Sequence, residues 1–544
     1  MVNSSSFGFT QFSKSGASIT LTLTCLTSRS RPLAPATTRA SRRGASLSTS
    51  RRGTPPACET SSAMLMGTPA NKALLVESRL GGPEAGMDGP NDLIVALAAR
   101  DPSIAESALA KATALLMDRR PATAAGPEYV APQTIAEALS EAPDANLAIV
   151  STPGAYATAE ALQSLKRGLH VFLFSDNVPI TDEIEMKRLA VRKGLLMMGP
   201  DCGTSVLDGV PLGFANELGR GRIGLIGASG TGLQEVSCLI DRMGEGVSQV
   251  IGVGGRDLDE HIGGMMLLAA FGLLSADPAT DVIVLISKPP SPAVAQRIVE
   301  AASSSPKPVV VNFLGGDPTA VRAGGAMPAT TLEDAAVAAV ALCRGVRTGD
   351  LPTGEPEASS VETAQLQAMR LAPRQRSIRR LYSGGTFCKE ARLILEQKLG
   401  PERMTDHVLI DLGDDEYTVG RPHPVIDFRL RNEKIVAAAQ DPATGVILLD
   451  VVLGHGANPD PAEALLPALE RARREAAGQG RHLVIIASVC GTAADPQDLH
   501  RQEATLETVG VLLASSNGQA ARLASVVIEQ MSAASGPFGR RAAQ

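Results

Sequence analysis

The sequence predicts an α/β protein with parallel sheets, divided into two to four domains. Short apolar runs alternate with amphipathic segments of helical length, a pattern typical of parallel sheets with right-handed crossovers. Several of the apolar runs end in loops of glycine and small polar residues. The composition agrees, because 3% aromatic residues, 53 Gly and no Trp suit stacked layers of helices and sheets.

The chain of 544 residues is too long for a single hydrophobic core. Changes in periodicity and composition predict the domain boundaries. The stretch rich in Thr, Gly, Pro, Glu and Ser before residue 377 predicts a linker, because it lacks periodicity. We expect, in order, a transit peptide or disordered segment (1–61), a first α/β domain (62–215), a second α/β domain (220–345), the linker (346–376), a third α/β domain (377–530) and a disordered tail (531–544).

Charge is distributed unevenly along the chain. The first 58 residues contain Lys14 and seven Arg but no Asp or Glu, a net charge of +8; since the whole chain carries −6, the remainder carries −14. This acidic body argues against nucleic acid as a main partner. The Ser-, Thr- and Arg-rich start predicts a transit peptide for a plastid or a mitochondrion. The alternative is a disordered N-terminal tail without a targeting function, on a cytoplasmic protein.

Two further classes are not expected. No apolar run is long enough to span a bilayer, so we expect no membrane partner. The seven Cys lack the CxxC spacing of zinc sites, and the Asp and His residues lack metal-ligand spacing, so no metal is predicted. Reduced thiols in an intracellular compartment are the expected state.

The most informative stretch is a glycine loop after the apolar run 223–226. Glycines let the backbone approach a ligand closely, and the N–H groups and positive dipole end of the following helix favour an anion. The loop therefore predicts a phosphate site; the alternative is a tight turn whose glycines only permit close packing. The expected phosphate-binding residues of this loop are Ser229, Gly230, Thr231 and Gly232.

A second small-residue loop follows the predicted strand near residue 380. Its expected phosphate-binding residues are Ser383, Gly384, Gly385 and Thr386, on a weaker signal than the first loop. If both loops bind, two helix N-termini aim at one anion from opposite sides and stabilise charge on a transferring group.

Three ionisable residues are the catalytic candidates. Lys288 lies at a predicted strand end and is expected either to contact phosphate or to cap a surface. His423 and Arg421 lie in one segment with Asp411, Asp414 and Asp415. A general acid/base histidine and a carboxylate-binding arginine suit a dianionic substrate. The alternative is a solvated loop with internal ion pairs.

Three segments together resemble the FdrA family, which belongs with proteins of the succinyl-CoA synthetase type. They are Met66 to Lys72, Met198 to Ser205, and Ile410 to Asp415 continuing to Gly420-Arg421-Pro422-His423-Pro424. The similarity covers about 62–527. It implies that the first domain resembles a CoA-binding, Rossmann-like domain and that the next two resemble the flavodoxin-like ligase domains of the α- and β-subunits, without the ATP-grasp domain.

The resemblance also makes CoA a candidate cofactor. In the first segment, Asn71 and Lys72 could hold CoA or another phosphate, although a plain helix N-terminus is as good an interpretation. The expected CoA-binding residues are Gly67, Thr68, Asn71, Lys72, Asn177 and Asn216.

The chain departs from true synthetases at their phosphorylated histidine. The corresponding region, 322–327, contains no histidine, and Ser287-Lys288 stands where the histidine-holding glutamate is found. A lysine in place of a carboxylate favours a bound anion over an imidazolium. A phosphohistidine relay is therefore not expected.

What is understood of the FdrA family implies carbamoyl transfer in a multi-subunit enzyme at the end of allantoin breakdown. In this reaction oxalurate and phosphate give oxamate and carbamoyl phosphate, with phosphate as a substrate. One alternative is an acyl-CoA synthetase of the succinate-CoA ligase type that uses a separate ATP-grasp partner. Another is a non-catalytic subunit that binds CoA or phosphate.

Overall fold

The computed structural model describes the chain from 132 to 534, apart from 347–353 and 419–420. Before 132 it describes the elements of the first unit and a few residues between 107 and 112. The chain divides into two compact units, Met1–Glu141 and Ala142–Gln544. This division falls inside the range 62–215, which the sequence predicts as one domain. The predicted domain is divided because the strands before residue 141 and those after it belong to different sheets.

The first unit holds a five-stranded sheet in the order β3-β2-β1-β5-β4. β4 is antiparallel to β5, and α1 follows β4 directly, as the sequence predicts for a strand that ends at Met66. β1 to β3 lie in the segment expected to be a transit peptide, much of which is outside the described residues. The elements are β1 (Leu21–Thr27), β2 (Pro35–Ser41), β3 (Gly44–Ser50), β4 (Thr60–Met66), α1 (Pro69–Glu77), β5 (Leu93–Ala99) and α3 (Ile135–Glu141).

The second unit begins with a small parallel sheet, here called the small layer (147–198). Its strand order is β6-β7-β8, and α4 and α5 cover it. Met186 and Ala190 of α5 are fully buried in the core shared with the next sheet. The elements are β6 (Leu147–Val150), α4 (Gly154–Lys166), β7 (His170–Leu173), α5 (Ile180–Lys193) and β8 (Met197–Met198).

The central domain (204–343) is built on a seven-stranded sheet in the order β10-β9-β12-β11-β13-β14-β15. Its five strands from β11 to β15 run parallel, and β9 joins β12 antiparallel. The elements are β9 (Thr204–Leu207), β10 (Val210–Gly213), β11 (Arg220–Gly227), α6 (Gly230–Arg242), β12 (Val247–Gly252), α7 (Met265–Ala276), β13 (Val282–Ser287), α8 (Pro292–Ser303), β14 (Val309–Phe313), α9 (Pro318–Ala323), β15 (Met327–Pro328) and α10 (Leu332–Cys343).

The C-terminal domain (377–534) has a parallel five-stranded sheet in the order β17-β16-β18-β19-β20. Parallel sheets and alternating helices confirm the predicted α/β class. The elements are β16 (Ser377–Tyr382), α12 (Gly385–Leu399), the 3-10 helix η3 (Pro401–Asp406), β17 (Val408–Asp411), α13 (Asp415–Thr418), α14 (Arg429–Gln440), β18 (Thr444–Val452), α15 (Pro461–Gly478), β19 (Val484–Cys490), α16 (Leu499–Thr508), β20 (Leu512–Ala514) and α17 (Asn517–Ala534).

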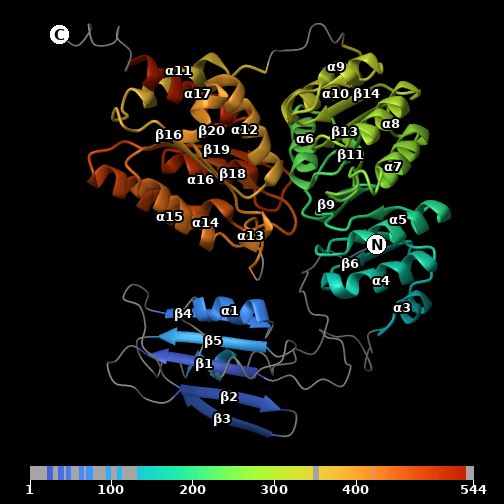
Figure 1. The fold of residues 1–544 in the computed structure, drawn as a ribbon, viewed down its shortest axis with the longest axis horizontal. Helices are drawn as coiled ribbons and strands as arrows, with labels where there is room; N and C mark the ends of the chain where they lie inside the picture. Colours follow the sequence, from blue (N-terminus) through green and yellow to red (C-terminus); the bar gives the residue numbers. More distant parts are fainter. Residues whose placement is uncertain are drawn as a thin grey trace. The chain divides into compact units, whose positions relative to one another are not determined.

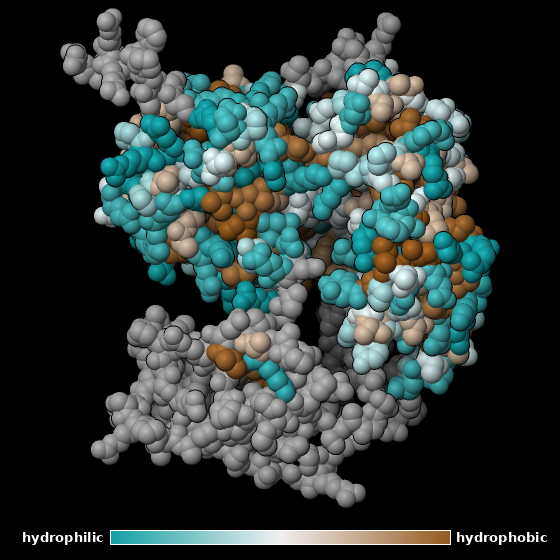
Figure 2. All heavy atoms as spheres, viewed as in Figure 1, coloured by the Kyte–Doolittle hydropathy of each residue, from teal (hydrophilic) through white to brown (hydrophobic). Residues whose placement is uncertain are grey.

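The central and C-terminal domains share one hydrophobic core. The cluster runs from Ile223 and Leu233 of the central domain to Phe387 and Val527 of the C-terminal domain without a break. Four helices meet between the two sheets: α6 and α10 from one domain, α12 and α17 from the other. Figure 1 shows these two α/β halves of the second unit in green and orange. The visible surface of the C-terminal domain is largely hydrophilic in Figure 2, as expected when the apolar helix faces turn inward.

Two predicted unstructured segments contain helix. The predicted linker, 346–376, contains α11 (Ala358–Ala368), whose Ala364 and Ala368 are fully buried against α17. The linker interpretation is corrected for this part, because a short alanine-faced helix gives a weak periodic signal. α17 extends to Ala534, into the predicted tail, and 535–544 lie outside the described residues. No helix in the described part of the chain is long and apolar enough to cross a membrane.

Buried carboxyl groups form hydrogen bonds between the central and C-terminal domains. The Glu390 carboxylate on α12 accepts hydrogen bonds from the Leu332 amide (2.7 Å) at the start of α10 and from Asn517 Nδ2 (2.6 Å) at the start of α17. Glu235 of α6 accepts one from the Asn517 amide (2.9 Å). Burial raises the pKa of Glu390 to about 7, although these hydrogen bonds oppose it.

We expect the stability of the protein to fall as pH rises from 5 to about 7.5. A carboxyl whose pKa rises from 4.5 to about 7 on folding binds its proton more tightly in the folded state. The stabilisation is therefore complete at low pH and lost as pH rises through 7, by about 3 kcal/mol. Urea unfolding across this pH range should show a flatter profile for Glu390→Gln. Glu185→Gln, an exposed change on α5, should keep the wild-type slope; equal slopes in all three proteins would contradict the assignment.

Candidate functional site

Both large sheets place a small-residue loop at the point where their strand order reverses. In the central sheet, β11 lies between β12 and β13, and the chain leaves it through α6 towards β12. In the C-terminal sheet, β16 lies between β17 and β18, and the chain leaves it through α12 towards β17. Ligands of open α/β sheets bind in the crevice at such points, at the carboxyl ends of the strands. The two predicted phosphate loops occupy these positions.

The first loop forms a capped helix start. Ser229 is the N-cap of α6, and its Oγ accepts a hydrogen bond from the Gly232 amide (3.1 Å). Glycine is needed at position 232, because a Cβ there would lie 2.6 Å from Ser229 Oγ. The amides of Gly230 and Thr231 lie in the first turn of α6, so they have no acceptor within the helix. Both N–H groups lie at the positive end of the helix dipole. The loop is thus a capped helix start with free amides, and its binding of phosphate stays a prediction.

The second loop corrects part of the prediction. Ser383 N (2.8 Å), Ser383 Oγ (2.8 Å) and Gly384 N (2.9 Å) all donate to the carboxylate of Asp450 on β18. Since an internal carboxylate already takes these donors, Ser383 and Gly384 do not contact a phosphate in this arrangement. The amides of Gly385 and Thr386, in the first turn of α12, are the donors that the helix leaves for a ligand.

The two loops touch each other. Ser229 Oγ and Thr386 Oγ1 are 2.5 Å apart and share a hydrogen bond. A Cβ at Gly384 would lie 2.8 Å from Thr231 Cγ2, so the close contact requires glycine there. Two helix N-termini from two domains therefore converge, and their dipoles add at one place.

Two lysines place positive charge beside this contact. Lys288 follows β13, the strand next to β11, and Lys389 lies one turn after Gly385 on α12. The pKa of Lys389 is lowered, first by burial and then by the charge of Lys288. Burial chiefly raises the pKa of Asp411, and Lys288 opposes that rise. The charge of Lys288 thus acts on Lys389 of α12 and on Asp411 at the end of β17.

His423 joins this cluster of loops. The position of a Cβ on Gly413 lies 3.2 Å from His423 Nε2 and 2.8 Å from the Ser383 carbonyl oxygen. His423 Nδ1 accepts a hydrogen bond from the Val425 amide (3.3 Å), which leaves the proton on Nε2. Burial lowers the pKa of the His423 imidazole, so it is neutral at pH 7. Arg421 lies exposed two residues before His423, and its role in orienting a substrate stays a prediction.

The predicted CoA-binding residues are not gathered at one place in the second unit. Asn216 is corrected: its Nδ2 donates to Asp495 (2.7 Å) and to the Leu453 carbonyl (3.2 Å), and its Oδ1 accepts from Gln234 (3.0 Å). This amide joins the central and C-terminal domains and is 2% exposed, so its hydrogen bonds serve the protein's own groups. Asn177 is exposed in the loop after β7, with a positive φ of 53°.

The remaining predicted CoA-binding residues belong to the first unit. Asn71 and Lys72 lie half-buried in α1, and Gly67 and Thr68 lie outside the described residues. In the parts of the chain that the structure describes, no group of three or more His, Cys, Asp or Glu side chains could hold a metal ion.

Sequence reasoning missed Asp450, Lys389 and Phe214. Asp450 carried a signal, because it is the one charged residue in the apolar strand 446–452. The Phe214 ring packs 5.6 Å from the His423 ring and 5.4 Å from that of Phe174, between centroids. Neither Phe214 nor Lys389 had a local signal, because their partners come from other elements.

We expect Ser229→Ala to destabilise the protein by about 1–2 kcal/mol, since it removes both the helix cap and the bond to Thr386. Thr386→Val removes only the bond between the domains and should cost less, about 1 kcal/mol. Urea unfolding of the two variants measures the difference. Equal losses would show that the cap of α6 contributes nothing measurable.

Three family models match the chain. The model of the CoA-ligase family matches 381–527, and that of the CoA binding domain matches 219–315. The CoA binding domain model thus matches within 220–345, which the resemblance implies to be the first of the two ligase domains. The model described as AllF, heavy metal-associated domain, matches 57–132. This range contains one cysteine, Cys58, and no histidine.

Several curated proteins are similar to the chain. The protein YahF of Escherichia coli (strain K12) is 41% identical over 478 residues, which cover 84% of this chain and 91% of YahF. The α-subunit of an ADP-forming succinate–CoA ligase from Methanothermobacter thermautotrophicus is 27% identical over 155 residues, 28% of this chain and 52% of that subunit. The sulfoacetate-CoA ligase subunit SauD of Bilophila wadsworthia is 26% identical over 181 residues, 32% of this chain and 60% of SauD.

Among the solved structures that match the chain is the ATP citrate lyase of Methanothrix soehngenii in complex with citrate and coenzyme A. It has a TM-score of 0.34 and 14% identity, and the match covers 74% of this chain and 85% of that one. The family assignment depends instead on the extent of the match to YahF and on the two ligase-related models. The chain belongs to the FdrA family of succinyl-CoA-synthetase-like proteins.

Proposed function

We propose that the chain is the phosphate-handling subunit of a carbamoyltransferase that converts oxalurate and phosphate into oxamate and carbamoyl phosphate. The observation that carries the proposal is the meeting of the α6 and α12 N-termini at Ser229 and Thr386. Two helix dipoles and the adjacent lysines suit a multiply charged oxyanion. The absence of histidine from 322–327 supports direct transfer to phosphate over a phosphoenzyme relay.

In this reaction a phosphate oxygen attacks the carbamoyl carbon of oxalurate, and the bond from that carbon to the internal nitrogen breaks. The amides of Gly230 and Thr231 and the Lys288 ammonium are proposed to hold the phosphate. The departing nitrogen takes up the proton that hydrogenphosphate loses. That proton passes from phosphate to nitrogen directly, and His423, a neutral imidazole with its proton on Nε2, is proposed to orient the substrate by donating a hydrogen bond from Nε2.

Acyl-CoA ligation is the second candidate, and the matches to the CoA binding domain and CoA-ligase models favour it. The named ligases among the relatives are subunits, so this reaction is proposed to need an ATP-grasp partner chain. It requires CoA and a nucleotide, which carbamoyl transfer to phosphate does not. The two reactions are therefore separable by their substrates.

The test uses the full chain purified with its partner subunits. With oxalurate and phosphate we expect carbamoyl phosphate and oxamate in equal amounts, without added nucleotide or CoA. Thioester formation that depends on ATP and CoA, with no carbamoyl phosphate, would replace the first proposal by the second. Labelling of the chain by γ-phosphate-labelled ATP at a histidine would also count against direct transfer.

Lys288→Gln is expected to raise the KM for phosphate about tenfold or more, because one charge-assisted contact to the anion is lost. Lys398→Gln is the matched control, since Lys398 lies near the end of α12 and pairs with Glu355 on the surface (2.9 Å). The control should keep the wild-type KM. A Lys288→Gln enzyme with an unchanged KM would remove Lys288 from the site.

A further inference from the structure

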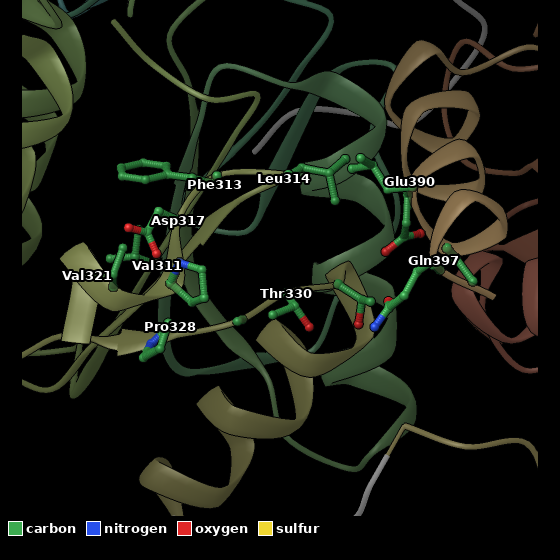
Figure 3. A pocket seen from close by; sticks show the side chains of 16 residues that line it. Val311, Phe313, Leu314, Asp317, Val321, Pro328, Thr330, Glu390 and Gln397 are labelled. Atoms are coloured by element: carbon green, nitrogen blue, oxygen red, sulfur yellow. The ribbon is translucent and has the colours of Figure 1, made fainter. Parts of the chain in front are cut away.

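A cavity of about 220 Å³ lies at the carboxyl end of β14, between the central domain and α12. Figure 3 shows its walls, with Leu314 and Thr330 on opposite sides and Glu390 and Gln397 reaching in from α12. Glu390 lies one helical turn beyond Thr386, so this cavity is separate from the contact between the two phosphate loops. Contacts between domains at strand ends are common places for small-molecule sites.

The floor of the cavity is apolar and its rim is polar. Val311 and Leu314 are 1% exposed and Val321 is 2% exposed. Thr330 and Gln397 are exposed at the rim. Such a lining suits a molecule with a short hydrocarbon body and one polar end. The volume, below the roughly 300–1,000 Å³ of pockets for drug-sized ligands, limits it to a small molecule.

The charge in the lining has one sign. Of the sixteen described residues that line the cavity, Asp317 and Glu390 are those that can carry charge, and both are acids. Figure 3 places them on opposite sides of the cavity. An anion such as phosphate would meet two carboxyl groups and no cation there, which is unfavourable in a partly buried space. This cavity therefore cannot serve the same ligand as the loops.

Glu390 also has capacity for another hydrogen-bond donor. Each of its carboxylate oxygens accepts one hydrogen bond from the protein, from Leu332 N at 2.7 Å and from Asn517 Nδ2 at 2.6 Å. A carboxylate oxygen can accept two. An ammonium group in the cavity would donate a charge-assisted hydrogen bond to Glu390. The carbon chain of the same molecule would cover the apolar floor.

We propose that this cavity is a binding site for a small organic amine, held by Glu390 at its charged end and by the apolar residues of β14 along its body. The proposal goes beyond the phosphate-dependent reaction and does not require it. Because Glu390 also holds the starts of α10 and α17, an amine bound there would contact the network that joins the two domains.

The experiment titrates the full chain with butylamine, butyramide and butyrate, three probes of the same length and different charge. We expect butylamine to raise the midpoint of thermal unfolding and to give ligand-observed NMR contacts, and butyrate to do neither. Glu390→Gln should weaken butylamine binding about tenfold or more. Equal binding of butyrate or butyramide would overturn the proposal.

A second pair of variants keeps the test valid if Glu390→Gln does not fold. Gln397→Arg adds a cation at the cavity rim and should compete with the amine for Glu390, so that butylamine binding falls about tenfold. Gln365→Arg adds the same charge on the exposed face of α11 and should leave binding unchanged. If both variants bind butylamine equally weakly, the amine is attracted only by the acidic surface in general, and the proposed site is rejected. Neither outcome depends on whether the protein transfers carbamoyl groups.

Discussion

Asp450→Ala is expected to destabilise the C-terminal domain by about 3–5 kcal/mol. Asp450 is 1% exposed and pairs with Arg431 (2.7 Å), which is fully buried in the domain. Removing the carboxylate leaves a guanidinium without its counter-ion and leaves the donors of Ser383 and Gly384 unpaired. Unpaired buried charge is among the most destabilising changes in a folded protein. Urea unfolding, followed by circular dichroism, measures the loss.

Arg431→Met provides the matched control in a double-mutant cycle. If the unpaired charge dominates, Asp450→Ala with Arg431→Met should be more stable than Asp450→Ala alone, because the double variant buries no lone cation. Part of the loss should remain, since the Ser383 loop still lacks its acceptor. Additive losses in the double variant would show that Arg431 and Asp450 do not stabilise each other.

The order of strands and helices could be predicted because its signals are local. The loop at Ser229 is a clear case, since glycines at 227, 230 and 232 mark the turn and the helix start within six residues. The contact with the second loop could also be anticipated as two helix ends aimed at one anion. Which atoms meet could not, because Ser229 and Thr386 lie 157 residues apart.

The roles of buried polar side chains were the least predictable part. Asn216 looked like a cofactor ligand, yet its partners Leu453 and Asp495 lie 237 and 279 residues further along the chain. The Ser383 loop looked like an anion site, and it is one, but its anion is the protein's own Asp450. In both cases the sequence suggests that a polar group is free to bind a ligand. Only the folded structure shows which distant protein group forms its hydrogen bonds.

Lys187→Met is expected to cost about 3–5 kcal/mol and to loosen the small layer from the central domain. Lys187 of α5 is fully buried, and its ammonium contacts Glu183 (2.8 Å), Asp257 (2.7 Å) and the Val253 carbonyl (3.0 Å). Both carboxylates are also fully buried, so the methionine variant buries two negative charges against one remaining cation, Arg256, which pairs with Glu183 (2.8 Å).

The effect should be local before it is global. Asp257 also accepts hydrogen bonds from the amides of Met266 (3.2 Å) and Leu267 (2.9 Å), so its displacement would uncap α7, while the core shared by α6 and α12 stays intact. Hydrogen exchange should therefore accelerate in β6 to β8 and α7 more than in β16 to β20. Arg188→Met, an exposed change on the same helix, should leave exchange as in the wild type. Uniform acceleration throughout the second unit would mean that the buried ions stabilise the whole fold and that the small layer has no separate attachment.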